Sequence, residues 1–354
     1  MVNFNCRAIT NALTILPNSN IAPCCVIKDN YSKPITLIEN KNKFADLQIE
    51  GVPDACKQCT KYPESSYKNN FDKFSGNNLN YLDFRNSNLC NLKCRTCGPH
   101  SSSSWAKELN FVQPIVHTDT LEYVRKILNQ DIQVIYFAGG EPLLNKDHWQ
   151  LLELLVELNY ANNIKLLYST NLTVTTYKNL NAVNLWKKFK HVNLMVSVDA
   201  IGTPFNYIRS GANWSDVDKN INSLLKEKNI DLSLSFTLSA ISVWFLPDVL
   251  TYAKQKQIKV NIIQLTDPHY FTLNVFPETL INQCIEVLNQ CKKISSEYDK
   301  EIDLAIQIAR NNDDQSSFIT LVSNILLTDK IRSESLFDLL PFKKLAMQEM
   351  FKNQ

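Results

Sequence analysis

The stretch 79-LNYLDFRNSNLCNLKCRTC-97 joins a predicted strand to three closely spaced cysteines. Its first seven residues alternate in the way that is typical of a strand with one buried face. Cys90, Cys94 and Cys97 follow that strand directly. Three thiolates on one short loop can hold three irons of a 4Fe–4S cluster and leave the fourth iron open to a substrate or cofactor. The alternative is a zinc knuckle, for which His100 is the only local fourth ligand.

Downstream of this stretch, apolar strands alternate with helical segments. The predicted strands span 79–85, 132–138, 164–169, 192–198, 231–238 and 259–265, and the predicted helices span 104–109, 118–129, 148–159, 177–188, 216–229 and 246–256. This alternation indicates a parallel sheet, and right-handed crossovers curl such a sheet toward a barrel. Six units fall short of the eight of a closed barrel. We therefore predict an α/β fold with a partial (β/α)6 TIM-like barrel.

Polar motifs follow the predicted strands at the points where they end. They are Cys90, the segment Gly139-Gly140-Glu141, the pair Thr170-Asn171, and Asp199. Loops beyond the carboxyl ends of parallel strands converge and build ligand sites, so we expect these motifs to share one rim. Glycine is scarce, with 7 in 354 residues, which makes an adjacent glycine pair less expected by chance.

A second group of cysteines lies near the N-terminus and comprises Cys6, Cys24, Cys25, Cys56 and Cys59. Four ligands from one module could close a second 4Fe–4S cluster or a structural zinc site. Burial as small apolar residues is the remaining interpretation. Adjacent side chains diverge, so Cys24 and Cys25 are not expected to bind the same metal. The turn-forming residues 17–23 place Cys24 after a short strand, and the sequence leaves open whether Cys24 or Cys25 is the ligand.

Composition narrows the class of protein. The 37 Lys and Arg against 35 Asp and Glu leave a formal charge of +2, which argues against a dedicated nucleic-acid binder. No apolar run approaches the roughly 18 residues of a membrane span, and the first residues do not resemble a signal peptide. We expect a cytoplasmic chain without a membrane partner, whose ten cysteines bind metal or do redox chemistry. Cys284 and Cys291 are expected to be core residues, with a thiol hydrogen donor for epimerisation as the alternative.

The motifs together resemble the radical S-adenosylmethionine (SAM) superfamily. The spacing Cys90-x3-Cys94-x2-Cys97 after a first strand is similar to the signature of that family, and Gly139-Gly140-Glu141-Pro142 is similar to its GGEP element. The resemblance covers residues 79–265. The N-terminal cysteines resemble the auxiliary-cluster modules of the SPASM/twitch subgroup, although such modules usually follow the barrel and here the module precedes it.

The resemblance implies three regions and two clusters. The regions are a cysteine-rich twitch-like module at 1–78, a radical SAM partial barrel at 79–270 and a helical C-terminal extension at 271–354. The implied ligands of the SAM-binding 4Fe–4S cluster are Cys90, Cys94 and Cys97. The implied ligands of an auxiliary 4Fe–4S cluster are Cys6, Cys24, Cys56 and Cys59.

The resemblance also implies which residues bind SAM. They are Gly139, Gly140, Glu141, Thr170, Asn171, Ser197, Asp199 and Arg209. Of these, Gly140 and Glu141 would contact the SAM amino group, and Arg209 would hold the carboxylate through its planar guanidinium. Ser197 and Asp199 would face the ribose or the methionine part. Simpler roles exist, since Glu141 could cap a helix, Asp199 form a turn and Arg209 a surface ion pair.

The implied activity is reductive cleavage of SAM to methionine and a 5′-deoxyadenosyl radical, which abstracts hydrogen from a substrate. An electron donor such as flavodoxin or ferredoxin would supply the electron. The first hypothesis is an oxidoreductase or transferase that modifies a peptide or protein. The second is a radical dehydrogenase or epimerase of a small molecule such as a sugar or cyclitol. The non-enzyme alternative is a structural iron–sulfur or zinc-binding module.

Overall fold

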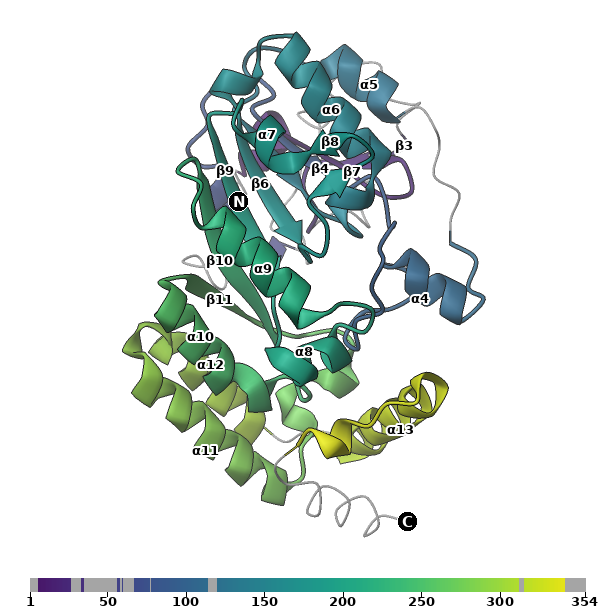
Figure 1. The fold of residues 1–354 in the computed structure, drawn as a ribbon, viewed down its shortest axis with the longest axis vertical. Coiled ribbons are helices and arrows are strands. Elements are labelled where there is room, and N and C mark those ends of the chain that lie inside the picture. The colour runs from purple at the N-terminus through teal and green to yellow at the C-terminus, as the bar shows by residue number, and fades with distance from the viewer. Residues whose placement is uncertain are drawn as a thin grey trace, which may run out of the picture.

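The computed structural model describes residues 6–26, 33–34, 56–57, 59, 67–76, 78–113, 120–311 and 315–340. Its centre is a nine-stranded sheet in the order β11-β10-β9-β6-β5-β4-β1-β2-β3. Helices run alongside the strands, and further helices of the C-terminal part gather beyond the last strands, as Figure 1 shows.

All six predicted strands are present in the sheet. They are β4 (Tyr81–Phe84), β5 (Val134–Phe137), β6 (Lys165–Thr170), β9 (His191–Ser197), β10 (Ile230–Leu238) and β11 (Lys259–Gln264). Each pairs in parallel with the next. Side chains along β6 and β9 alternate between buried and half-buried, so one face of the sheet packs on helices and the other forms the open inner face of the curved sheet. The predicted partial (β/α)6 barrel is confirmed.

The N-terminal residues add three strands to the same sheet. They are β1 (Ala12–Ile15), β2 (Asn20–Ala22) and β3 (Lys33–Pro34), preceded by the short helix α1 (Ala8–Asn11). Strand β1 pairs in parallel with β4, and β2 returns antiparallel to β1, so the predicted hairpin turn exists. Asn11 is fully buried and donates to the carbonyl of Asn78 at 2.9 Å and to Oδ1 of Asn80 at 3.0 Å. The N-terminal segment is thereby joined to the first barrel strand.

Most predicted helices are present with shifted ends. The helices of the barrel are α4 (Ser103–Glu108), α5 (Thr120–Ile127), α6 (Lys146–Glu157), α7 (Ala182–Trp186), α8 (Gly202–Ile208), α9 (Trp214–Leu224) and α10 (Leu246–Lys256). The helix expected at 177–188 is wrong in its first part, where β7 (Thr176–Tyr177) and β8 (Leu180–Asn181) form a hairpin. Lys178 adopts a positive φ of 52° in that turn, and the side chain of Asn181 caps α7 by accepting from the amide of Asn184.

Short 3-10 turns connect several of these elements. They are η5 (Tyr67–Asn70), η6 (Pro142–Leu144), η7 (Ala161–Asn163), η8 (Val243–Phe245), η9 (His269–Phe271), η10 (Leu273–Val275), η11 (Ser296–Tyr298) and η12 (Leu336–Asp338).

The C-terminal part is helical, as predicted. It contains α11 (Glu278–Ile294), α12 (Asp299–Arg310) and α13 (Gln315–Arg332). Cys284 and Cys291 of α11 are completely buried in the apolar core, as expected for core residues. Burial raises the pKa of each thiol to about 12. None of the described helices combines the length and apolar character that a membrane-spanning segment requires.

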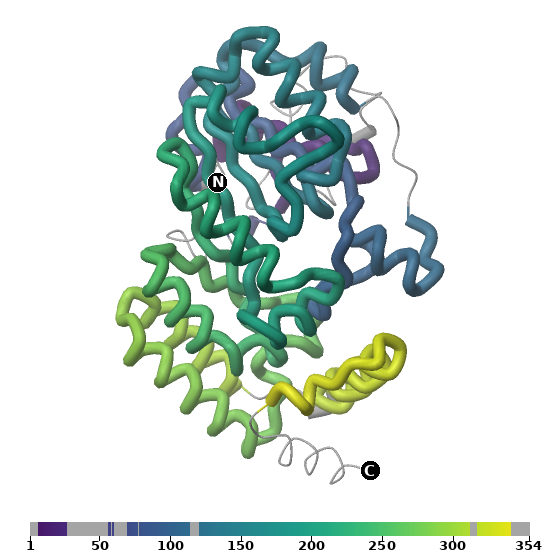
Figure 2. The backbone as a smooth tube through the Cα atoms, viewed as in Figure 1, coloured from purple at the N-terminus to yellow at the C-terminus, as the bar shows by residue number. Residues whose placement is uncertain are grey.

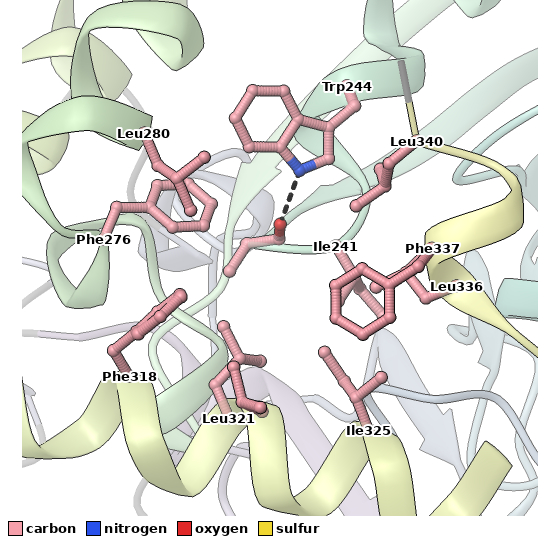
Figure 3. A pocket seen from close by; sticks show the side chains of 12 residues that line it. Ile241, Trp244, Phe276, Leu280, Phe318, Leu321, Ile325, Leu336, Phe337 and Leu340 are labelled. Atoms are coloured by element: carbon pink, nitrogen blue, oxygen red, sulfur yellow. Dashed lines mark hydrogen bonds between the residues drawn. The ribbon is translucent and has the colours of Figure 1, made fainter. Parts of the chain in front are cut away.

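Helix α13 is anchored to the barrel by apolar side chains. Phe318, Leu321 and Ile325 face Trp244 and Phe276 around a small apolar pocket, shown in Figure 3. The indole of Trp244 donates to a main-chain carbonyl at 2.9 Å, so its one polar group is satisfied there. The chain after α13, at the yellow end of the tube in Figure 2, returns to the same pocket at Leu336 and Leu340. The last turn of α13 itself reaches α4, where Arg332 pairs with Glu108. The end of α13 therefore lies beside the loop that carries the three cysteines.

Candidate functional site

The loop from Cys90 to Cys97, called the cysteine loop below, is fixed by its main chain. The amides of Lys93 and Arg95 donate to the carbonyls of Ser210 and Ile208, each at 2.8 Å. In the cysteine loop these two bonds lie on either side of Cys94, and in the facing segment they lie on either side of Arg209. Beyond the loop, Ser102 caps α4 and donates its hydroxyl hydrogen to a loop carbonyl at 2.6 Å.

The three thiols of the cysteine loop influence one another electrostatically. Burial raises the pKa of Cys94 to about 12, Arg209 lowers it, and the charges of Cys97 and Cys90 raise it further. Burial also raises the pKa of Cys90 and of Cys97. Such mutual effects require the sulfurs to lie near each other.

The donor chemistry of the cysteine loop fits a cluster. Its three cysteines are half-buried, and each thiolate of a 4Fe–4S cluster binds a different iron. Three neighbouring thiols on one loop therefore match the cluster that the spacing predicts.

Arg209, at the end of α8, lies against this group and is 9% exposed. Its Nη1 is 3.8 Å from Sγ of Cys94, and its Nη2 is 2.8 Å from Oδ2 of Asp199. The other oxygen of Asp199 accepts the amide hydrogen of Thr237 at 2.8 Å. Burial acts to lower the pKa of Arg209, but the charges of Asp199 and Cys94 raise it. Arg209 is thus a buried and oriented cation, not a surface ion pair.

One donor of Arg209 is left over. Its Nε is buried and has no hydrogen-bond partner among the described residues. A buried N–H without a partner is costly, and a guanidinium edge matches a carboxylate. This orphaned donor beside the thiols fits the carboxylate of a bound amino-acid group, which SAM has.

Glu141 follows β5 and is 2% exposed. One carboxylate oxygen accepts from the amide of Leu143 at 3.1 Å and from the hydroxyl of Thr170 at 2.8 Å, while the other accepts from the amide of Asn171 at 2.6 Å. Burial raises the pKa of Glu141 to about 7, although these hydrogen bonds oppose the shift. Glu141 therefore caps η6 and also ties the loop after β5 to the loop after β6.

The two glycines permit a close approach of main chains. A Cβ on Gly140 would lie 2.3 Å from the carbonyl oxygen of Leu89, and one on Gly139 would lie 2.7 Å from that of Ser87. Gly139 also has a φ of +107°. The amides of Gly140 and Glu141 donate to those same two carbonyls at 2.9 Å and 2.7 Å. The segment is thus packed directly on the main chain that enters the cysteine loop.

Asn171 connects the third loop to the thiols. Its Nδ2 donates to Oδ1 of Asn91 at 3.0 Å and is 4.0 Å from Sγ of Cys90. Ser197 lies on the half-buried face of β9, paired in register with Ser235. The structure therefore brings the polar motifs at the strand ends to one rim, as the sequence predicts.

The N-terminal cysteines occupy the opposite end of the sheet. The charges of Cys59 and Cys6 contribute to a pKa of Cys56 that burial raises to about 11. Cys24 is buried in the same small apolar cluster as Cys56, which includes the first residues of β1, β4 and β5. The charge of Cys25 raises the pKa of Arg85 and of Tyr136, and Tyr136 packs against the same apolar cluster. The four predicted auxiliary ligands thus gather in one region.

Sequence reasoning missed a set of charged residues around the cysteine loop. They are Arg95, Glu108, Asp329, Arg332 and Glu334. The only local signal is that Lys93 and Arg95 flank Cys94, which does not reveal partners more than 200 positions away.

Comparison with known proteins identifies the family. Residues 87–238 match the family model of the radical SAM superfamily. These residues form a radical SAM domain. Such a domain implies a 4Fe–4S cluster and SAM as cofactors, an electron donor and a substrate. The resemblance seen in the sequence is therefore confirmed at the level of the superfamily.

Individual relatives are distant. The GTP 3′,8-cyclase of Sulfurimonas denitrificans is 25% identical over 193 residues, which cover 52% of this chain and 56% of that protein. The chain thus spans about half the length of this curated relative. Among solved structures, anSMEcpe with bound AdoMet is 22% identical over 63% of this chain and 61% of that one, with a TM-score of 0.45. Streptococcus suis SuiB bound to S-adenosylmethionine is 15% identical over 76% and 55%, with a TM-score of 0.41.

Proposed function

We propose that this radical SAM enzyme binds its catalytic cluster through Cys90, Cys94 and Cys97 and acts on an uncharged, hydrogen-bonding substrate. A peptide or protein is the first candidate, and a sugar or cyclitol alcohol shares the same chemistry. The observation that carries the proposal is the buried Arg209, which Asp199 orients onto Cys94. The chemistry that a 4Fe–4S cluster and SAM supply when bound is one-electron cleavage of the sulfonium, giving a radical that abstracts hydrogen.

The residues of the rim divide the work of holding SAM. Arg209 offers its unpartnered Nε to the carboxylate, and Asp199 keeps the guanidinium in that orientation. Glu141 accepts three hydrogen bonds, and a carboxylate has about four acceptor positions, so one remains for the SAM amino group. Gly139 and Gly140 let that carboxylate sit close to the cysteine loop. Thr170, Asn171 and Ser197 are assigned to the same ligand.

The charges at the rim support a neutral substrate. In the described part of the chain, each arginine near the cysteine loop or on the inner face is paired with a carboxylate. The pairs are Arg85–Asp83, Arg95–Asp329, Arg209–Asp199 and Arg332–Glu108. A nucleoside triphosphate needs several cations that are free to bind phosphate oxygens. Half-buried polar groups suit amide or hydroxyl groups of a substrate instead. An example is the pair of hydroxyls of Tyr136 and Ser169, whose oxygens are 2.7 Å apart.

A nucleotide substrate is the second candidate, because curated relatives are GTP 3′,8-cyclases. The two candidates make opposite predictions for isothermal titration of the reconstituted, SAM-loaded protein with GTP. We expect no binding at GTP concentrations up to about 1 mM, and no SAM cleavage stimulated by GTP. Stoichiometric binding of GTP would contradict the neutral-substrate proposal. Peptide mixtures and polyols, tested in parallel for stimulated SAM cleavage, separate the two neutral classes.

We further assign Cys6, Cys24, Cys56 and Cys59 to an auxiliary 4Fe–4S cluster in a twitch-like module at 1–78, which precedes a barrel at 79–270 and an extension at 271–354. The apolar cluster around Cys24 and Cys56 contains the first residues of β4 and β5, whereas the cysteine loop follows the other end of β4. The first and last residues of β4 are three steps apart, which at about 3.3 Å per residue separates these ends by about 10 Å along the strand. A substrate on the inner face would lie between the two clusters.

Iron analysis tests this assignment. Anaerobically reconstituted protein should hold about eight irons, and Cys56→Ala should hold about four. If the parent protein holds only about four irons, the assignment of an auxiliary cluster is wrong. An electron donor of the flavodoxin or ferredoxin type would reduce either form.

A further inference from the structure

The end of helix α13 contacts the cysteine loop across more than 200 residues of sequence. Three charged residues make these contacts, and we call them the α13 clamp: Asp329, Arg332 and Glu334. Asp329 and Arg332 belong to the last turn of α13, and the amide of Glu334 donates to the carbonyl of Asp329 at 3.0 Å. The clamp residues are therefore held together as one unit.

Arg332 makes the first half of the clamp, and its side chain is 3% exposed. Its Nη2 is 2.7 Å from Oε2 of Glu108, and its Nε is 3.2 Å from both oxygens of that carboxylate. Its Nη1 donates to the carbonyl of Lys93 at 2.9 Å. The guanidinium also lies 4.3 Å from the ring centre of Trp105. The indole N–H of Trp105 in turn donates to the carbonyl of Cys94 at 2.8 Å.

Asp329 and Glu334 make the second half by binding Arg95. Nη2 of Arg95 is 2.8 Å from Oδ1 of Asp329 and also contacts a carboxylate oxygen of Glu334. The guanidinium of Arg95 lies 4.0 Å from the ring centre of Tyr207, whose hydroxyl donates to the same oxygen of Asp329 at 2.8 Å. Arg95 is 4% exposed, so its charge depends on these carboxylates.

The two halves grip the loop on both sides of one ligand. Arg332 holds the carbonyl before Cys94 directly and the carbonyl of Cys94 through Trp105. The carboxylates of Asp329 and Glu334 bind the side chain of Arg95, the residue after Cys94. We propose that the α13 clamp positions Cys94 for cluster binding, so that the C-terminal helix is a working part of the cluster site. This inference rests on the proposed cluster in the cysteine loop.

The main test compares Arg332→Met with Lys330→Met. Lys330 is an exposed residue of the same helix, so the control removes the same charge without touching the loop. Hydrogen–deuterium exchange is followed in the iron-free protein, in peptides that contain Lys93 and Arg95, whose amides bond Ser210 and Ile208. We expect exchange in these peptides to quicken at least tenfold in Arg332→Met and to stay within twofold of the parent in Lys330→Met.

Iron release gives a second readout. A Cys56→Ala, Cys59→Ala background is reconstituted anaerobically, so that the iron reports on the cysteine loop, and a chelator is added. Arg332→Met should release iron at least tenfold faster than this background, and Arg332→Lys should fall between them because a single ammonium cannot replace the bidentate contact. The reduced cluster should also show an altered electron paramagnetic resonance signal on SAM addition.

Several outcomes would overturn the clamp. Unchanged exchange in the loop of folded Arg332→Met would do so, as would an equal increase throughout the chain, which indicates a general loss of stability. If Arg332→Met does not fold, Glu334→Gln replaces it, because Glu334 is 29% exposed; exchange and iron release identical to the parent would then refute the proposal. A parent loop that binds no iron refutes the proposed function instead, and the exchange measurement still decides the clamp.

Discussion

Replacing Gly140 by alanine tests the close contact between the GGE segment and the cysteine loop. The added Cβ would lie 2.3 Å from the oxygen of Leu89 and 2.6 Å from the carbonyl carbon of Asn88. Non-bonded atoms of this kind pack about 3.5 Å apart, so the two main chains must separate by about 1 Å. No rotamer relieves the contact, because both neighbours are backbone. Overpacking typically costs 1–3 kcal/mol, and we expect the upper end, about 3 kcal/mol.

The displacement acts on Leu89, the residue before Cys90, so cluster binding should suffer together with stability. Urea unfolding of the iron-free protein measures the first effect, and iron per chain after anaerobic reconstitution measures the second. Gly98→Ala is the matched control, because Gly98 directly follows the cysteine loop and a Cβ there would meet nothing within 4 Å. We expect the control to stay within about 0.5 kcal/mol of the parent. Equal stability and equal iron content for the two variants would refute the packing argument.

Three further predictions concern groups outside the glycines. The pKa of about 7 for Glu141 means that the folded protein keeps a proton that the unfolded chain releases above about pH 4.5, so stability falls as pH rises through this window. Urea unfolding at pH 5 and pH 8 measures this effect. From pH 5 to pH 8, the free energy of unfolding of Glu141→Gln should rise by about 2–3 kcal/mol relative to that of the parent. Free energies of unfolding that change in parallel with pH in the two proteins would contradict this. Leu321→Ala should lower the free energy of unfolding by about 2–4 kcal/mol, because it opens a cavity in the α13 anchor; a loss below about 1 kcal/mol in the same assay would place α13 elsewhere. Cys284 and Cys291 should resist iodoacetamide at pH 8 until denaturant is added, since both are buried with pKa values of about 12, and mass spectrometry of native protein showing rapid labelling would argue for a reactive role.

The barrel strands could be predicted because their signal is local. Runs such as residues 132–138 and 192–198 are apolar and bounded by polar turns, and a buried parallel strand needs little else. The polar rim followed from topology, since motifs at successive strand ends must converge. The strand Ala12–Ile15 was not predicted, because four residues carry no periodicity, and it is recognisable only through its pairing with Tyr81–Phe84.

The partners of the site residues were harder to predict than their positions. Asp199 and Arg209 were both named from the sequence as ligands of SAM, yet nothing in the sequence shows that they bind each other. The pair Arg332 and Glu108 is separated by 224 residues, and an ion pair of that range leaves no pattern in either segment. Contacts of this kind depend on how helices pack on the finished barrel, which local propensity does not determine.

The most direct test of the account is SAM cleavage by the anaerobically reconstituted protein. With dithionite as reductant, the parent should convert SAM to 5′-deoxyadenosine and methionine, measured by chromatography. Cys94→Ala should form none, because the cysteine loop then lacks one of its three thiolates. 5′-Deoxyadenosine formed by Cys94→Ala at the rate of the parent, or none formed by an iron-loaded parent, would contradict the claim that this loop holds the catalytic cluster.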